Sequence, residues 1–162
     1  AGIGRVSKGL LLPLGFRRCD LVEPSARILE AAPEYIGELH ASDCRYICSS
    51  LQDFYPSANT YNLVWIQWVN IYLTDLDFVR FFNRVGKSLK PGGIVVIKEN
   101  VCDDQAFIVD RDDSSLSRSL PYLLSLLEQT QLKVIKKCME DKFPEDLFPV
   151  AMIALEIDES DE

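Results

Sequence analysis

Short apolar runs alternate with amphipathic stretches along the chain, an order that is typical of an α/β protein. Runs rich in β-branched and aromatic residues predict strands over 19–23, 45–50, 62–68, 94–100, 132–138 and 150–157. Helical patterns lie between these runs. The chain therefore predicts a mostly parallel, twisted sheet with crossover helices on both faces, as in Rossmann-like proteins.

Three helices are expected between the strands. Ser25 can cap a helix that runs to about Leu39, and Asp75 can cap the next one. This second helix carries an apolar stripe at helical spacing: Phe78, Phe82, Val85 and Leu89. The turn residues "KPGG" at 90–93 end it. After a polar loop over 100–113, a third helix is expected over 114–130, with Pro121 as a local interruption.

Length and composition indicate one globular domain. The chain has 162 residues, 48% of them hydrophobic, and it contains no linker or repeat, so we expect a single domain over 1–162. The acidic tail at 157–162 is expected to be a solvated terminus. No apolar run approaches the roughly 20 residues that span a membrane, and we expect no membrane association and a monomer.

Charge and cysteine content exclude several classes of site. A net charge of -8 argues against a nucleic-acid partner and favours cationic partners such as basic peptides or amines. Five cysteines without a C-x-x-C pair argue against a disulfide framework or a structural zinc site. The single histidine, His40, has no companions for a metal site or a catalytic triad, so no metal is expected.

The first candidate site is the glycine turn in "AGIGRVSKGLLLPL" at 1–14. Gly2 and Gly4 let a ligand approach backbone N–H groups, and Glu23 ends the next strand, where an acid can accept ribose hydroxyls. A dinucleotide fingerprint would place a third glycine or an alanine at Ser7, so S-adenosylmethionine fits better. Arg5 could pair with a carboxylate. The alternatives are an ordinary glycine loop, a surface acid at the helix start and an exposed arginine.

Polar residues at the carboxyl ends of later strands extend this candidate site. Leu51 and Gln52 follow the second strand and could line an adenine edge, while Gln67 ends the third. Ligands of open α/β sheets collect at these strand ends, which makes Gln67 a candidate contact. A nucleotide-binding glycine turn normally follows a strand, but none precedes Gly2, so we expect a first strand to be missing from the chain.

Together the segments "AGIGR", "LLLPL", "LQDF", "WIQWV", "LTD", "GGIVVIKEN" and "DSS" with Arg118 resemble the protein α-N-terminal methyltransferases. The resemblance runs to about Leu155 and implies a class I methyltransferase fold, with the family's N-terminal helices also missing here. It implies S-adenosylmethionine as cofactor, and as substrates protein N-termini that begin Xaa-Pro-Lys, with a basic third residue. It also implies an enzyme of the nucleus and cytoplasm.

The resemblance assigns roles to individual residues. The implied cofactor contacts are Gly2, Gly4 and Arg5 at the methionine end, Glu23 at the ribose, Leu51 and Gln52 at the adenine, and Gln67. The implied substrate contacts are Trp68, Asn100, Asp110 and Phe148, with Asp113 as the base. Tyr72 could orient the amine by hydrogen bonding. The family more often has Asp at Glu23, Tyr at Phe148 and His at Tyr72.

Chemistry explains why a carboxylate is needed. An α-amine with a pKa near 8 is largely protonated at neutral pH, and a carboxylate can orient it and accept its proton directly or through water. Because a tyrosine phenol does not take up a proton near neutral pH, the role of base would fall on Asp113. Read alone, "DRDDSS" is also compatible with the N-cap region of a helix. Two other functions stay open: a catalytically impaired homologue that binds N-terminal peptides, and a small-molecule methyltransferase.

Overall fold

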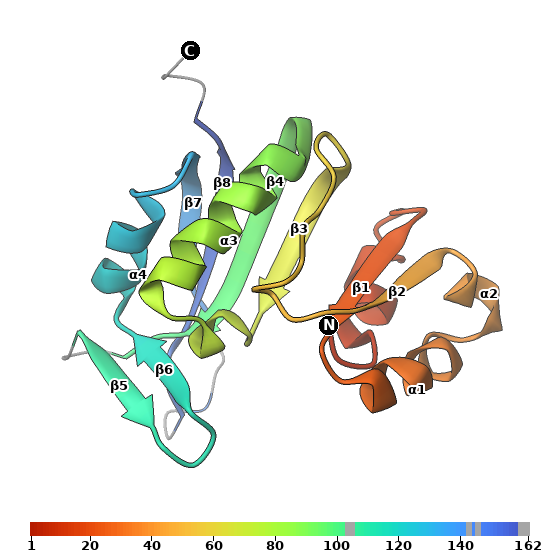
Figure 1. Cartoon of the computed structure of the whole chain (residues 1–162), viewed down its shortest axis with the longest axis horizontal. Helices are drawn as coiled ribbons and strands as arrows, with labels where there is room; N and C mark the ends of the chain where they lie inside the picture. Colours follow the sequence, from red (N-terminus) through yellow and green to blue (C-terminus); the bar gives the residue numbers. More distant parts are fainter. Residues whose placement is uncertain (103–105, 142–143, 145–146, 159–162) are drawn as a thin grey trace. The chain divides into compact units, whose positions relative to one another are not determined.

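The computed structural model describes residues 1–102, 106–141, 144 and 147–158. The chain divides into two compact units, Ala1–Phe54 and Tyr55–Glu162, shown in Figure 1. The expectation of a single domain stays a prediction. Most of the predicted acidic tail, residues 159–162, lies outside the described residues.

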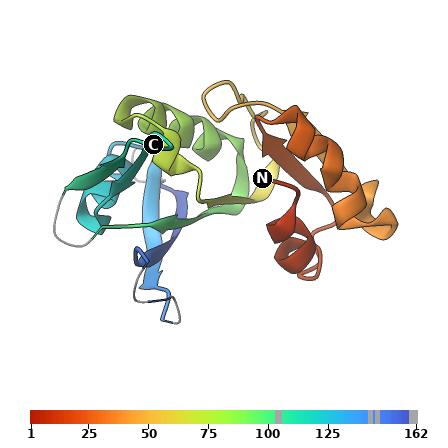
Figure 2. The same ribbon diagram turned by 90° about the horizontal axis from the view of Figure 1, so that it is seen from below.

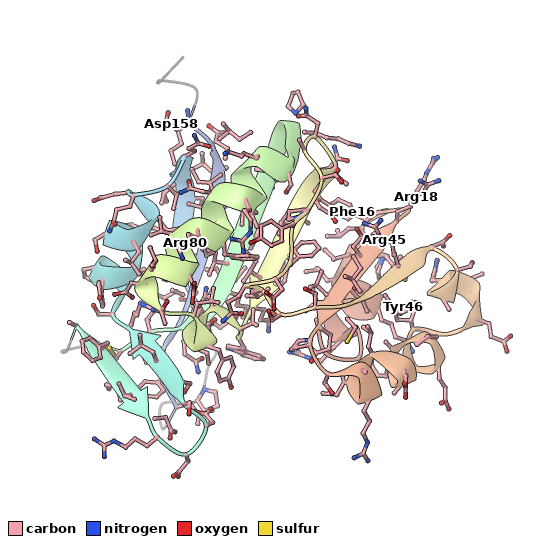
Figure 3. All side chains as sticks on the ribbon, in the orientation of Figure 1. Phe16, Arg18, Arg45, Tyr46, Arg80 and Asp158 are labelled. Carbon is pink, nitrogen blue, oxygen red and sulfur yellow. The ribbon has the colours of Figure 1, made fainter. Side chains whose placement is uncertain are left out.

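The first unit contains a two-stranded parallel sheet. Strands β1 (Cys19–Glu23) and β2 (Cys44–Cys48) pair in parallel, and the elements around them are η1 (Ser7–Leu11), α1 (Ala26–Ile36) and α2 (Glu38–Ala41). Figure 3 labels Arg45 and Tyr46 on β2; Arg45 forms an ion pair with Asp20 of β1, and the Tyr46 hydroxyl donates to the Ala41 carbonyl at 3.1 Å. Besides the packing of its core, this sheet is therefore stabilised by an ion pair between its two strands and by a hydrogen bond from β2 to α2.

Helix α1 packs its apolar face on this sheet. Its buried residues Leu29, Ala32 and Ile36 recur at helical spacing and contact buried side chains of β1. Ser25 caps the helix, since its Oγ accepts the Ile28 N–H at 3.4 Å. The predicted extent to Leu39 was wrong: Gly37, with φ at 96°, ends α1, and a separate short helix follows.

The second unit is built on a four-stranded sheet with the order β3-β4-β8-β7. Its strands are β3 (Tyr61–Gln67), β4 (Leu89–Asn100), β7 (Leu132–Met139) and β8 (Val150–Ile157). β3 and β4 pair in parallel, whereas β8 is antiparallel to both of its neighbours. The α/β class is confirmed, with more antiparallel pairing than expected, because β7 and β8 follow each other without a crossover helix.

Helices α3 (Asp75–Ser88) and α4 (Leu120–Leu127) pack against each other, and α3 lies along one face of this sheet (Figures 1 and 2). The core contains the predicted stripe residues Phe78, Phe82 and Val85, all at most 1% exposed. They are buried together with alternate residues of β4 and β8, namely Val95, Ile97, Ile153 and Leu155. The strands bury every second residue and the helix buries residues three to four apart, so each element turns one face to the core.

Two predicted details of α3 were wrong. Thr74 rather than Asp75 caps the helix, because the Thr74 Oγ1 accepts the Asp77 N–H at 3.2 Å. The carboxylate of Asp75 instead accepts hydrogen bonds from side chains of β6 and α4. Leu89 does not extend the apolar stripe but begins β4, so the segment 90–93 is part of a strand. Gly93 fits there because an added Cβ would lie 2.9 Å from the Tyr61 carbonyl oxygen.

The segment predicted as a loop and a helix contains a β-hairpin instead. Strands β5 (Phe107–Asp110) and β6 (Ser115–Arg118) pair antiparallel, and α4 begins only after Ser119, whose Oγ accepts the Tyr122 N–H at 3.3 Å. Ser115 and Ser117 are buried while Leu116 is less so, an alternation of period two that favours a strand. Pro121 lies in the first turn of α4 rather than interrupting it.

Across the described ranges, no helix is long and apolar enough to cross a membrane. Within those same ranges, no group of three or more His, Cys, Asp or Glu side chains is arranged to hold a metal ion.

Candidate functional site

The first unit brings the glycine turn and Glu23 together, as predicted. Glu23 Oε2 accepts the Gly2 N–H at 2.9 Å, and Oε1 accepts the Ser25 N–H at 3.1 Å. Gly4, with φ at 91°, packs so closely that an added Cβ would lie 2.9 Å from a methyl carbon of Leu21. The turn therefore needs glycine here both for its backbone conformation and for its packing.

Glu23 is held as a carboxylate. Burial disfavours its charge, but the N–H groups of Gly2 and Ser25, together with the positively charged amino group of Ala1, outweigh burial and lower the pKa of Glu23. An ionised carboxylate at the carboxyl end of β1 is suited to accept hydrogen bonds from ribose hydroxyls. The residues of this turn thus fit an adenosine cofactor.

The other predicted cofactor residues of this unit lie on exposed or half-buried segments. Arg5 is exposed at the start of the helical segment that follows the turn. The Ser49 N–H donates to the Glu23 carbonyl at 3.2 Å, which places the chain after β2 beside the end of β1. Leu51 and Gln52 follow this contact in the chain and are half-buried and exposed respectively.

In the second unit, Gln67 ends β3 and is oriented by a residue that the sequence reasoning missed. The Trp65 indole Nε1–H donates to Gln67 Oε1 at 3.0 Å. Both side chains lie on the same face of β3, since residues two apart on a strand point the same way. The two-residue spacing of Trp65 and Gln67 is the signal in the sequence from which this contact could have been predicted. The bond leaves the amide nitrogen of Gln67 as the donor for a further partner.

Trp68 and Asn100, both predicted to face the substrate, form a pair. The Trp68 indole N–H donates to Asn100 Oδ1 at 3.1 Å, and the Trp68 backbone N–H donates to the Lys98 carbonyl at 3.1 Å. Trp68 has φ at 50°, a conformation that is uncommon for a large side chain. The chain is therefore bent sharply at the end of β3, and surrounding contacts must hold the bend.

Glu99 provides such contacts. It is 2% exposed, and its Oε2 accepts the N–H groups of Val69 at 3.0 Å and Asn70 at 3.2 Å, while Oε1 accepts that of Asn100. Burial raises the pKa of Glu99 to about 7, against the effect of these N–H groups. The sequence reasoning missed Glu99, although it continues the buried alternation of Val95 and Ile97.

Tyr72 and Asp113 meet, although they lie far apart in the chain. Tyr72 ends η2 (Asn70–Tyr72), and its hydroxyl donates to Asp113 Oδ2 at 3.3 Å. Asp113 Oδ1 accepts the Ser115 N–H at 2.9 Å. Burial, followed by the charge of Asp113, raises the pKa of Tyr72, and hydrogen bonds from Ser115 lower the pKa of Asp113. At neutral pH the pair is thus a phenol donor and a carboxylate.

The remaining predicted substrate residues are Asp110, which lies near Asp113 in the chain, and Phe148, which does not. Asp110 ends β5, and its Oδ1 accepts the Asp112 N–H at 2.9 Å, so it belongs to the same acidic hairpin turn as Asp113. Phe148 is 40% exposed and precedes Pro149, whose carbonyl accepts the Val101 N–H at 2.9 Å. Phe148 therefore lies close to the segment that follows Asn100. Chemically, this unit presents carboxylates, a phenol and an indole, which suit a cationic, amine-bearing ligand.

Comparison with known proteins identifies the family. Residues 1–156 match the model of a family described as AdoMet-dependent proline di-methyltransferase. The chain is 41% identical to alpha N-terminal protein methyltransferase 1 of Arabidopsis thaliana, with 98% of the chain and 58% of that protein covered. It is 39% identical to N-terminal Xaa-Pro-Lys N-methyltransferase 1 of Xenopus tropicalis, with 96% and 68% covered.

A solved structure agrees with these relatives. A SAM-dependent methyltransferase of Leishmania major superposes with a TM-score of 0.89 at 40% identity, covering 96% of this chain and 61% of that one. The chain thus spans 61% of the length of this structure and 58% of the length of the Arabidopsis relative. From its motifs, its fold and these matches, the chain belongs to the family of AdoMet-dependent proline di-methyltransferases.

Proposed function

We propose that this chain serves the S-adenosylmethionine-dependent methylation of the N-terminal α-amine of proteins that begin Xaa-Pro-Lys. The observation that carries the proposal is the hydrogen bond from the Tyr72 hydroxyl to Asp113, which lies on the acidic hairpin turn. The relatives named for this activity, with 39% and 41% identity, support it.

The cofactor is assigned to the residues of the glycine turn and the strand ends. The ionised Glu23 accepts hydrogen bonds from the ribose hydroxyls, and Gly2 and Gly4 allow the cofactor to approach the backbone closely. Arg5 pairs with the carboxylate of the cofactor. Leu51 and Gln52 are assigned to the adenine, and Gln67 donates through its amide nitrogen. When bound, S-adenosylmethionine supplies a methyl group on a positively charged sulfur.

The substrate is assigned to the second unit. Trp68 and Asn100 take the first residues of the peptide, Phe148 lies along it, and Asp110 pairs with the cationic third residue. Asp113 holds the α-ammonium group and receives its proton. Because the pKa of Asp113 is lowered, we expect it to pass the proton to water rather than retain it. Tyr72 keeps its own proton and orients the carboxylate.

The test is methyl transfer from labelled cofactor to an Xaa-Pro-Lys peptide, with an N-acetylated peptide as negative control. Replacing Asp113→Asn should lower kcat by about 10²- to 10⁴-fold, because it removes the group that receives the proton. Asp112→Asn is the matched control: it removes the same charge from the same turn, one residue away, and should leave kcat unchanged.

Three results would contradict the proposal. The acetylated peptide could be labelled as well as the free one, which indicates another acceptor. Equal losses in the two variants would mean that net charge alone matters. Binding of cofactor and peptide without any transfer would favour the impaired, peptide-binding homologue, and Tyr72→His should then raise the rate.

We further propose that the protein acts as a monomer in the nucleus and cytoplasm and binds neither nucleic acid nor membranes. The net charge of -8 supports the absence of a nucleic-acid partner. Light scattering of the purified protein and fluorescence imaging of the tagged protein test the monomer and the location. A dimer mass, or exclusion from either compartment, would overturn the respective statement.

A further inference from the structure

Arg118 belongs to the motifs that characterise the sequence, but the functional assignment leaves it without a role. Its side chain is buried, with 3% of the residue exposed, at the end of β6. Its Nη2 donates to the Leu73 carbonyl at 2.7 Å, and Nε and Nη2 donate to Asp75 Oδ1 at 2.9 and 2.8 Å. The second oxygen of Asp75 accepts the Tyr122 hydroxyl at 2.5 Å. A buried guanidinium is thus paired and hydrogen-bonded.

These contacts join the two segments that carry Tyr72 and Asp113. Leu73 directly follows Tyr72, and Asp75 begins α3 two residues later. Arg118 ends the strand that begins at Ser115, the residue whose N–H holds Asp113. Arg118 therefore connects the chain after Tyr72 to the strand after Asp113.

The segment with Tyr72 depends on such contacts. η2 has only three residues, and a single turn of this kind has too few internal hydrogen bonds to hold itself. Glu99 holds its amino end through the N–H groups of Val69 and Asn70. Arg118 holds the residue at its carboxyl end, because the Leu73 carbonyl is its acceptor.

We propose that Arg118 is a positioning residue, which holds Tyr72 opposite Asp113 through Leu73 and Asp75. The planar guanidinium is suited to this task, since it donates in two directions from one rigid group. Its consequence for methyl transfer rests on the proposed function. The position of Tyr72 does not, so the two can be tested separately.

The titration of Tyr72 reports on its position. Several causes raise the pKa of Tyr72. The largest is burial, the next are the charge of Asp113 and its hydrogen bond, and the smallest are the charges of Glu99 and Asp110. If the contact with Asp113 is lost, the phenol moves away from that charge and its pKa falls towards the ordinary value near 10. A residue that only stabilises the fold would leave this titration unchanged in the folded protein.

The experiment uses protein labelled with ¹³C at the Cζ of tyrosine, with the Tyr72 signal assigned by Tyr72→Phe. Arg118→Lys keeps the positive charge but loses the planar guanidinium that donates in two directions, so the pH midpoint of the Tyr72 titration should fall. Arg80→Lys, at an exposed arginine of α3, is the matched control and should leave the midpoint unchanged. In the transfer assay, Arg118→Lys should lower kcat by about 10²-fold with the KM for the cofactor unchanged.

Asp75→Asn provides a second variant if Arg118→Lys fails to fold, because Asp75 is partly exposed and asparagine preserves its size. It weakens the same connection and should also lower the Tyr72 midpoint. An unchanged midpoint in a folded Arg118→Lys or Asp75→Asn protein overturns the positioning role. Absence of transfer by the wild type would instead overturn the proposed function, and the titration would still decide the role of Arg118.

Discussion

Replacing the buried acid Glu99→Gln should remove a pH dependence of stability between pH 5 and 8. Burial raises the pKa of Glu99 from 4.5 to about 7 in the folded state, whereas the unfolded chain keeps the ordinary value. Between these two values the folded state binds more protons than the unfolded state. The free energy of unfolding therefore falls as the pH rises through this window.

The magnitude follows from the shift. At 1.36 kcal/mol per pKa unit, a rise from 4.5 to about 7 corresponds to about 3 kcal/mol of stability that is present at pH 4.5 and lost by pH 8. Other shifted acids do not interfere. Glu23, Asp75 and Asp113 have lowered pKa values, so their contributions are lost only as the pH falls below this window.

Urea unfolding followed by tryptophan fluorescence is a suitable assay. The chain has two tryptophans, Trp65 and Trp68, and both belong to the second unit, close to Glu99 in the sheet. The wild type should be less stable at pH 8 than at pH 5, and Glu99→Gln should lack most of this difference. Glu128→Gln, the same change at an exposed position, should behave like the wild type. Equal pH dependences in the wild type and Glu99→Gln would refute the reasoning.

Two further predictions concern packing. Gly4→Ala should destabilise the first unit by about 1–3 kcal/mol, because the methyl group meets Leu21 at 2.9 Å on a backbone with positive φ. Gly9→Ala, where an added Cβ has nothing within 4 Å, is its control, and hydrogen exchange of β1 amides measures both; equal exchange would contradict the prediction. Phe82→Ala should cost about 3–5 kcal/mol in urea unfolding, since Phe82 is fully buried. A loss below 1 kcal/mol would show that the core closes over the cavity.

Local patterns in the sequence were sufficient for most secondary structure. Apolar runs rich in β-branched and aromatic residues predicted the strands that contain Cys19, Gln67 and Ile97, and helical spacing predicted the buried stripe of α3. Errors occurred where a local signal has two readings. The segment 114–118 contains serines and an arginine that suit a helix start or a strand, and its pairing with β5 decided for the strand.

The candidate site likewise has residues that the sequence was sufficient to predict and residues that it was not. Residue types at the strand ends were sufficient to predict the glycine turn with Glu23. The family's motifs were sufficient to select Tyr72 and Asp113 as site residues, but only the structure showed that they meet. The side chains that orient them were mostly not predictable. Glu99 bonds residues 29 and 30 positions away, and Arg118 bonds residues 43 and 45 positions away.

The sequence by itself determined most of the segments that become strands and helices, and which residue types are present at their ends, because these depend on near neighbours and on periodicity. Only the tertiary structure decided which polar groups meet and in which charge state. A buried Glu99 that holds a turn, and a phenol that donates to Asp113, depend on burial and on partners brought together by folding. Both effects are electrostatic and change with the local dielectric environment, which a linear sequence does not contain.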